Sequence, residues 1–183
     1  MTEALETREG LSEPLRVLLK DYPREAWEAD PGFSQLIQFW FSRHAMFREL
    51  CARITELLEA HLDKRVDPQL MKPHHTRYAN MLLGGLHEYH HVEDDHYFPK
   101  LIVLEEKLEH GFEILDRDHH DLTERLEAIA AASNVMLQAP EDDREAAEGA
   151  LKEISRLGRL LDRHLWDEEE LIVPVLLKHG MDG

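Results

Sequence analysis

The chain has 183 residues, enough for one domain with a substantial core but short for two. Its formal net charge of −17 argues against nucleic acid as a partner. No apolar stretch approaches the roughly 20 residues that span a bilayer, so we expect no membrane partner either. The single cysteine, Cys51, excludes an intramolecular disulfide and a two-cysteine redox motif. The first residues lack the basic and apolar regions of a signal peptide, so we expect a cytoplasmic protein.

Residues 1–30 are predicted to form an N-terminal arm with one short leucine-rich amphipathic piece, packed on the rest of the chain. Asp30-Pro31 is a favourable helix start, with aspartate as N-cap and proline at the first helical position. From there a three- and four-residue repeat predicts a helix that runs to about His61. The inward stripe of this helix reads Ile37, Trp40, His44, Phe47, Cys51, Ile54 and Leu58.

Three more helices are predicted further along the chain. The second begins near Pro73, and the third begins at Gly111 and ends before Pro140. The fourth follows, with Pro174 near its end. Because the connections are short, neighbouring helices should be antiparallel. We therefore predict an all-α fold, an up-down-up-down four-helix bundle over residues 31–183 with the short N-terminal arm beside it.

Histidine interrupts the apolar stripe of every predicted helix. The inward histidines are His44, His90, His119 and His164, in chain order. Asp94 and Glu168 stand four residues after His90 and His164, which places each carboxylate on the face of its histidine. Burying such groups without partners costs several kcal/mol each, so we expect a cation to collect them. Imidazole with carboxylate suits iron, manganese or zinc, and the lack of thiolates argues against a structural zinc finger.

The register of the second helix leaves alternatives open. Two pairs have the four-residue spacing, His90 with Asp94 and His91 with Asp95. Glu93 is a further candidate, because it stands six residues before a proline, as Glu168 does. We prefer His90 with Asp94, since both fall on the predicted inward stripe, which reads Leu83, His87, His90, Asp94, Tyr97 and Leu101. Additional ligands are considered at His87, His91, Glu93 and His120.

Other polar residues near these motifs have simpler interpretations. The acidic residues expected to form a solvated face are Asp95, Asp167, Glu169 and Glu170. Trp40 and Trp166 are expected to be packing residues near the site. Tyr97 is either a core aromatic or a hydrogen-bond donor to a ligand.

The motifs that carry a family resemblance are His44 on the first helix and three longer segments. These segments are His-His-Val-Glu-Asp-Asp-His-Tyr-Phe-Pro, Asp-His-His-Asp-Leu and His-Leu-Trp-Asp-Glu-Glu-Glu-Leu-Ile-Val-Pro. On these motifs the chain resembles the hemerythrin-like family, also called the HHE cation-binding domain, from about Phe39 to about Lys178. The resemblance implies a non-haem di-iron centre in a four-helix bundle. The implied bridging carboxylates are Asp94 and Glu168, and the implied terminal ligands are His44, His90, His119 and His164.

One position departs from the family pattern. Oxygen-carrying members supply a second histidine one turn after the third-helix ligand, where this chain has Thr123. His87, His120 or a solvent molecule would then complete the set.

The resemblance implies a non-haem di-iron protein that binds or senses dioxygen or nitric oxide, or protects against them. A second hypothesis is a di-iron oxidoreductase, either peroxidase-like or similar to the iron–sulfur-centre repair proteins. A third is a zinc-binding or metal-free helical interaction module. Iron is the expected metal, with zinc or manganese as alternatives. The expected partner is a small molecule (dioxygen, nitric oxide or peroxide), with a protein partner or a homodimer as further options.

Overall fold

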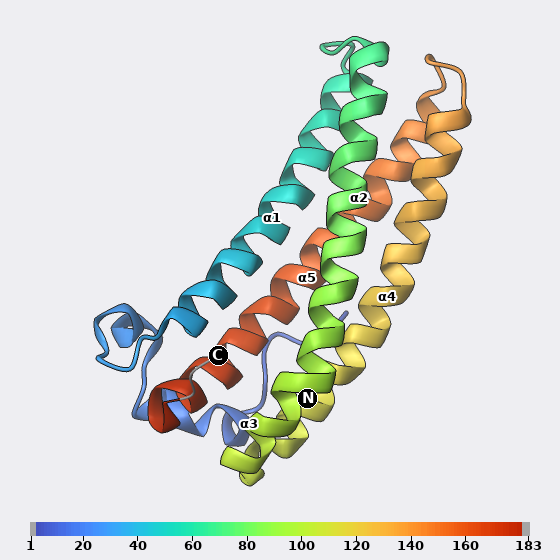
Figure 1. Ribbon diagram of the computed structural model, residues 1–183. Helices are drawn as coiled ribbons and strands as arrows, with labels where there is room; N and C mark the ends of the chain where they lie inside the picture. The colour runs from blue at the N-terminus through green and yellow to red at the C-terminus, as the bar shows by residue number, and fades with distance from the viewer. Residues whose placement is uncertain (1–2, 181–183) are drawn as a thin grey trace. The chain divides into compact units, whose positions relative to one another are not determined.

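The computed structural model describes residues 3–180, and within that range the chain is helical and has no strand (Figure 1). Four long α-helices are accompanied by shorter helical segments. The long helices are α1 (Gln35–Leu62), α2 (Pro68–Val92), α4 (Glu109–Gln138) and α5 (Arg144–His179). The short segments are η1 (Glu13–Lys20), η2 (Arg24–Ala29), the π-helical turn η3 (Glu93–Tyr97), α3 (Phe98–Leu104) and η4 (Glu106–Leu108). The predicted all-α class is confirmed.

The first long helix begins four residues later than predicted. Asp30 does not cap a helix; its side chain accepts a hydrogen bond from the Gly32 backbone N–H at 2.7 Å, and its carbonyl accepts one from Phe33 at 3.0 Å. These bonds form a turn after η2. Helix α1 therefore starts at Gln35, beyond the turn.

The second long helix begins one turn earlier than predicted. The Asp67 side chain accepts the backbone N–H of Gln69 at 2.8 Å, and Pro68 stands at the first helical position. Aspartate followed by proline is the helix start that was predicted for the first long helix, at Asp30-Pro31. The structure has this pattern at the start of the second long helix instead. Pro73 lies inside α2 rather than at its beginning.

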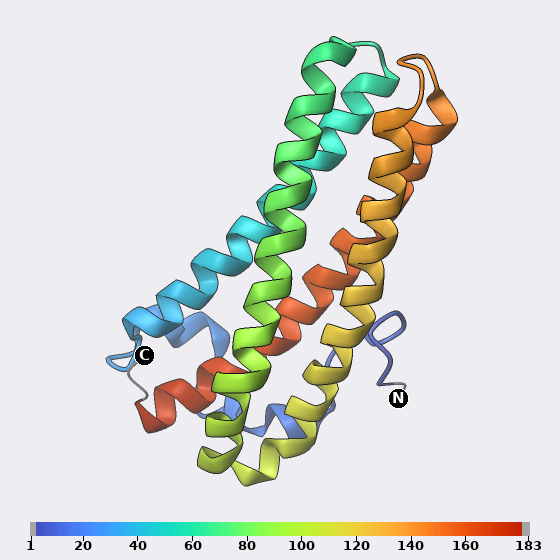
Figure 2. The same cartoon turned by 45° about the vertical axis from the view of Figure 1, so that its right-hand side comes forward.

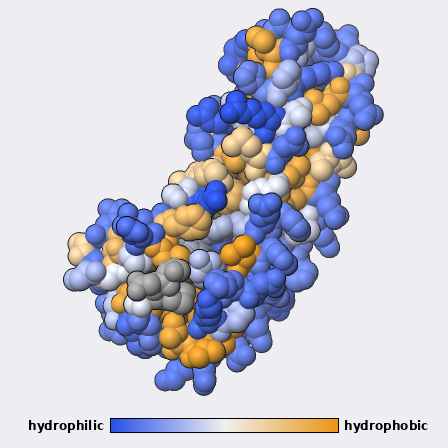
Figure 3. Space-filling model, in the orientation of Figure 1, coloured by the Kyte–Doolittle hydropathy of each residue, from blue (hydrophilic) through white to orange (hydrophobic). Residues whose placement is uncertain are grey.

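The described chain divides into two compact units, and each long helix contributes a segment to both. The first unit contains residues 3–45, 90–120 and 162–180, and the second contains 46–89 and 121–161. Hydrophilic residues cover much of the face shown in Figure 3, as expected from the net charge of −17. Among residues 3–180, no helix combines the length and apolar character needed to cross a membrane.

The second unit has an apolar core contributed by all four long helices. Its buried side chains include Leu50, Ile54, Leu58, Met71, Leu82, Leu86, Leu122, Leu126, Ile129, Ile154, Leu157 and Leu161. One buried polar pair interrupts this core, with Nε2 of His75 lying 2.9 Å from Oγ of Ser133. None of the inward histidines singled out by the sequence analysis lies in this unit.

Cys51 lies in the core of the second unit and should be chemically inert. Burial raises the pKa of its thiol to about 12. Because the thiolate is the reactive form, iodoacetamide at pH 8 should label the native chain on the order of a thousand-fold more slowly than the unfolded chain. The label reports on one site, since Cys51 is the single cysteine. Mass spectrometry over time measures both rates, and similar rates for native and unfolded chain would contradict the buried placement.

The first unit encloses the last part of α5 on every side. Residues 167–177 are buried without a break, so this helix has no solvent face there. The apolar run Leu171–Leu177 explains the burial of seven of these eleven residues, because a helix that is apolar all round must be covered all round. Figures 1 and 2 both show the N-terminal arm, in blue, beside the red C-terminal part of α5. The arm thus supplies part of the cover.

Candidate metal centre

A π-helical turn sets the direction of the side chains at the end of α2. The backbone N–H of Phe98 bonds to the carbonyl of Glu93, five residues back instead of four. Pro99 gives a local reason, because proline has no N–H to bond the carbonyl four residues earlier and its ring clashes with that carbonyl. As a result the buried face continues from Glu93 to Phe98, five residues on, and Tyr97 between them is only half-buried.

Six buried side chains meet in the first unit as two groups of three. The first group is His90, His119 and His164, and the second is His44, Glu93 and Glu168. Within each group, one nitrogen or oxygen from every residue lies within 4.8 Å of the others. They come from α1, α2, η3, α4 and α5, so only the tertiary packing brings them together.

Glu168 lies between the two groups and has one oxygen toward each. Its Oε1 is 3.4 Å from Nε2 of His44, and its Oε2 is 3.5 Å from Nε2 of His164. Glu93 also approaches both groups, with Oε2 3.6 Å from Nε2 of His119. The groups are therefore joined through two carboxylates.

Trp40 holds the two carboxylates in position from the α1 side. Its indole N–H donates to Oε1 of Glu93 at 2.9 Å and to Oε1 of Glu168 at 2.5 Å. The Tyr97 ring packs edge-on against the indole, with centroids 4.8 Å apart. Trp40 is thus more than the packing residue that was expected, because it fixes the orientation of both carboxylates.

Three of the four histidines have their outer nitrogen against a carboxylate. Nδ1 of His44 lies 2.9 Å from Glu169, Nδ1 of His119 lies 2.7 Å from Asp94, and Nδ1 of His164 lies 3.1 Å from Asp118. An ionised carboxylate only accepts hydrogen bonds, so each Nδ1 carries the proton. That tautomer leaves the lone pair of Nε2 directed into the cluster, as a metal ligand requires.

The environment shifts the pKa values of these groups in both directions. Burial lowers the pKa of His119 below its ordinary value. For His44 burial acts in the same direction, but Glu168 and Glu169 outweigh it and the pKa is raised. Burial alone would raise the pKa of Asp118, but His164 and Arg8 outweigh it and hold the pKa low. Asp118 is therefore ionised and able to accept the N–H of His164.

Comparison with known proteins bears directly on this cluster. A family model described as the hemerythrin HHE cation binding domain matches residues 35–176. The chain belongs to this family. No significant match was found among curated protein sequences or solved structures. Cation binding is what membership of the HHE family implies for this domain.

The buried donors of this HHE domain fit a cation. All six are imidazole nitrogens or carboxylate oxygens, a set that suits iron, manganese or zinc. Oε2 of Glu168 is fully buried and receives no hydrogen bond from any described residue. A buried carboxylate oxygen without a donor is unfavourable by a few kcal/mol, and a cation in contact with it removes that penalty.

The second-helix register differs from the preferred prediction. Glu93, which was kept as an alternative, joins the cluster, whereas Asp94 is absent from both groups. Asp94 instead accepts the outer N–H of His119, and its side chain is 27% exposed. The reason is the position of the inward stripe, which runs through the buried Leu82, Leu86 and His90 to Glu93, and a step of three residues keeps Glu93 on the same helix face as His90.

The other additional candidates lie outside the cluster. His87, His91 and His120 are all exposed. The fully buried Leu86 occupies the inward position that had been given to His87, because the apolar stripe runs one residue earlier than predicted. His91 pairs with Asp95 on the surface at 3.2 Å, and Nδ1 of His120 lies 2.9 Å from the Asp116 carbonyl oxygen. Thr123 is half-buried and supplies no ligand group.

The prediction of a solvated acidic face is wrong for three of its four residues. Asp167, Glu169 and Glu170 are 0%, 3% and 9% exposed. Arginines of the N-terminal arm cover them, Arg8 on Asp167, Arg24 on Glu169 and Arg16 on Glu170. Only Asp95 remains at the surface, as expected.

Asp118 and the arm arginines were missed by the sequence analysis. Asp118 directly precedes His119, so its role was hidden within a motif used for the histidine alone. One sequence feature could have indicated this cover. Four acidic residues, Asp167–Glu170, are followed by seven apolar residues, so the apolar part must be covered all round and the acidic part beside it needs cationic partners. Arginines at positions 8, 16 and 24 are the cations available in the arm.

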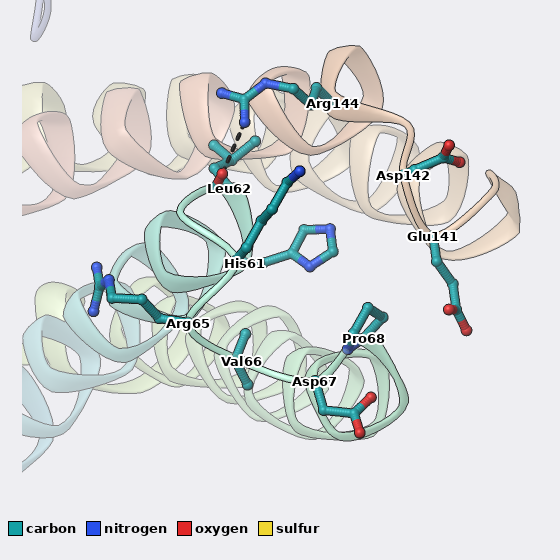
Figure 4. A pocket seen from close by; sticks show the side chains of 10 residues that line it. His61, Leu62, Arg65, Val66, Asp67, Pro68, Glu141, Asp142 and Arg144 are labelled. Carbon is teal, nitrogen blue, oxygen red and sulfur yellow. Dashed lines mark hydrogen bonds between the residues drawn. The ribbon is translucent and has the colours of Figure 1, made fainter.

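A separate pocket of about 680 Å³ lies in the second unit. It is lined by the α1–α2 and α4–α5 connections, and Figure 4 shows Arg144 at its edge bonded to the Leu62 carbonyl at 2.8 Å. Lysine, arginine, aspartate and glutamate side chains all line it, so it favours neither anions nor cations. No residue of the buried cluster takes part, which leaves the cluster as the candidate functional site.

Proposed function

We propose that this domain holds a dinuclear non-haem iron centre and binds dioxygen or nitric oxide there. His90, His119 and His164 would bind one iron, and His44 the other. Glu93 and Glu168 would bridge them. The observation that carries the proposal is the position of Glu168, whose two oxygens lie 3.4 and 3.5 Å from histidines of different groups. A mononuclear site would leave one of these oxygens without a cation.

The charge around the cluster also supports two cations. Contacts join seven carboxylates, at Glu93, Asp94, Asp118, Asp167, Glu168, Glu169 and Glu170. Four arginines oppose them, at Arg8, Arg16, Arg24 and Arg163. With every imidazole neutral, as metal ligation requires, this leaves three uncompensated negative charges in a largely buried region, an unfavourable state. One divalent cation compensates only part of this excess, and two compensate all of it.

The two halves of the proposed centre are unequal. Three imidazoles surround one position and a single imidazole the other, while both share the carboxylates. The His44 side would therefore have free coordination positions for a small ligand. When bound, two ferrous ions would supply those positions and the electrons needed to hold dioxygen or nitric oxide. The chain itself excludes bulk water, because all six donors are buried.

We further propose the arrangement of the surrounding helices. The first unit receives the starts of α1 and α4 and the ends of α2 and α5. Alternating starts and ends are what an up-down-up-down bundle places at one level. In this proposal residues 31–183 form the bundle and residues 1–30 the arm.

Anaerobic loading with ferrous iron tests the proposed function. We expect two irons per chain by metal analysis, followed by a new near-ultraviolet absorption band on exposure to air. Removing oxygen should reverse the band, and nitric oxide should give a distinct spectrum. No iron uptake, or zinc that iron cannot displace, would contradict the proposal.

The same preparation separates binding from catalysis. A di-iron oxidoreductase is the second candidate, because the single imidazole on the His44 side leaves room for peroxide. Rapid loss of the band with continuous consumption of peroxide and an electron donor would favour it. A stable band that peroxide does not turn over would favour binding or sensing.

A further inference from the structure

The N-terminal arm connects to histidines of the cluster through two ion pairs, Arg8 with Asp118 and Arg24 with Glu169. Arg8 is 6% exposed and donates two hydrogen bonds to Asp118, from Nη1 to Oδ1 at 3.1 Å and from Nη2 to Oδ2 at 2.5 Å. Its Nε donates to Asp167 at 2.8 Å. Oδ2 of Asp118 in turn lies against Nδ1 of His164. An arginine fork of this kind fixes the plane of a carboxylate.

A parallel connection leads from Arg24 to the other group. Its guanidinium stacks on the Trp166 ring at 3.7 Å and also lies 4.9 Å from the Trp27 ring centroid. From there it pairs with Oε2 of Glu169. Oε1 of the same carboxylate is 2.9 Å from Nδ1 of His44. Each group of the cluster thus has one histidine connected to one arginine of the arm.

The third arm arginine has no such connection. Arg16 pairs with Glu170 at 3.5 Å, and the other Glu170 oxygen accepts the Trp166 indole N–H at 3.0 Å. No contact between Glu170 and an imidazole is found within residues 3–180. Arg16 therefore shares the arm and the charge of the other two arginines, but not their route to the cluster.

We propose that Arg8 and Arg24 are positioning residues of the metal centre, which hold His164 and His44 through Asp118 and Glu169. This inference rests on the proposed metal-binding function. An outer carboxylate sets the tautomer and the ring orientation of a ligating histidine, and its loss typically lowers metal affinity about 10- to 100-fold. Arg8 and Arg24 act one step further out, by fixing those carboxylates.

The sign of the effect distinguishes positioning from simple electrostatics. Removing a positive charge near a cation site should strengthen cation binding by Coulomb's law. If the arginines act by positioning, their loss should instead weaken cation binding, because a released carboxylate no longer orients its histidine. Weaker binding after loss of an arginine therefore cannot come from the change in charge alone.

The test compares Arg8→Gln and Arg24→Gln with the matched control Arg16→Gln in the full chain. Cobalt(II) titration measures the two affinities, and circular dichroism verifies folding. We expect each of the first two variants to weaken one of the two cobalt sites about tenfold. The control should stay within about twofold of the wild type. If Arg8→Gln fails to fold, Arg24→Gln decides the question by the same criterion.

A second measurement uses the metal-free chain and reports on the histidines directly. Long-range ¹H–¹⁵N NMR distinguishes the imidazole tautomers. Arg8→Gln should perturb the His164 signals and spare His44, and Arg24→Gln should do the reverse. Unchanged imidazole signals, or cobalt affinity that is equal or tighter in both variants, would overturn the inference. If the wild type binds no cobalt or iron, the proposed function itself fails.

Discussion

Replacing Glu168 with alanine should reduce the metal content from two ions per chain to about one, because the position surrounded by His90, His119 and His164 keeps its three imidazoles. Glu168 is the side chain with one oxygen toward each group, so its loss removes a ligand from both metals at once. Without it, the His44 side would keep only one imidazole and Glu93. Two protein ligands are too few to retain a transition metal against buffer. Inductively coupled plasma analysis after loading and desalting measures the loss.

Glu170→Ala is the matched control for this variant. Glu170 lies on the same helix two residues later and is also buried, but it contacts Arg16 and Trp166 instead of a histidine. It should retain two metals per chain. Equal metal content in Glu168→Ala and the wild type would exclude Glu168 as a bridging ligand. Equal loss in both variants would show that the fold, not the ligand, had been damaged.

The metal-free Glu168→Ala chain should be less stable than the metal-free wild type at neutral pH. Burial alone would raise the pKa of the Glu168 carboxyl, but His44 and His164 outweigh it and hold the pKa low, so folding favours the ionised carboxylate, and its loss also leaves the Trp40 indole N–H without this acceptor. Thermal unfolding in the presence of a chelator measures this comparison, which also serves as the folding check for the metal assay.

Glu93→Ala should lose metal far more completely than Asp94→Ala, although the two residues are adjacent. Glu93 is buried with its carboxylate between the two groups, so its removal takes a ligand from the centre. Asp94 only supports the outer nitrogen of His119 at 2.7 Å. Its removal should weaken metal affinity about 10- to 100-fold and leave the stoichiometry at two.

This pair of variants tests the register of the second helix. Iron or cobalt titration gives both the stoichiometry and the affinity, and each variant serves as the folding control for the other. The opposite ranking, with metal lost in Asp94→Ala and kept in Glu93→Ala, would restore the four-residue pair His90 and Asp94.

Much of the site was predictable because it depends on long regular helices. His44, His119 and His164 each continue an apolar stripe in three- and four-residue steps, and all three are buried where the stripes indicate. Glu168 follows His164 by four residues in an unbroken helix, so the two share a face. Such periodicity is a local property of the chain. That these residues bind metal stays a prediction for the experiments above.

Prediction failed where the helical spacing allowed two answers. Glu93 and Asp94 stand three and four residues after His90, so both share its helix face and the spacing alone did not decide between them. The leucines Leu82 and Leu83 satisfy the stripe equally well, so choosing the wrong one placed His87 inside.

The apolar repeat of the sequence therefore determined the all-α class and the four inward histidines, and the motifs around those histidines carried the family resemblance. The helical class and the inward positions follow from the 3.6-residue repeat, which needs only neighbouring positions in the chain. Whether an acidic residue faces water or a buried arginine depends on partners remote in sequence, such as Arg8 and Asp167, which are 159 positions apart. Only the packed structure could reveal that the arm covers Asp167, Glu169 and Glu170, because no local pattern in α5 encodes which segment will compensate its charges.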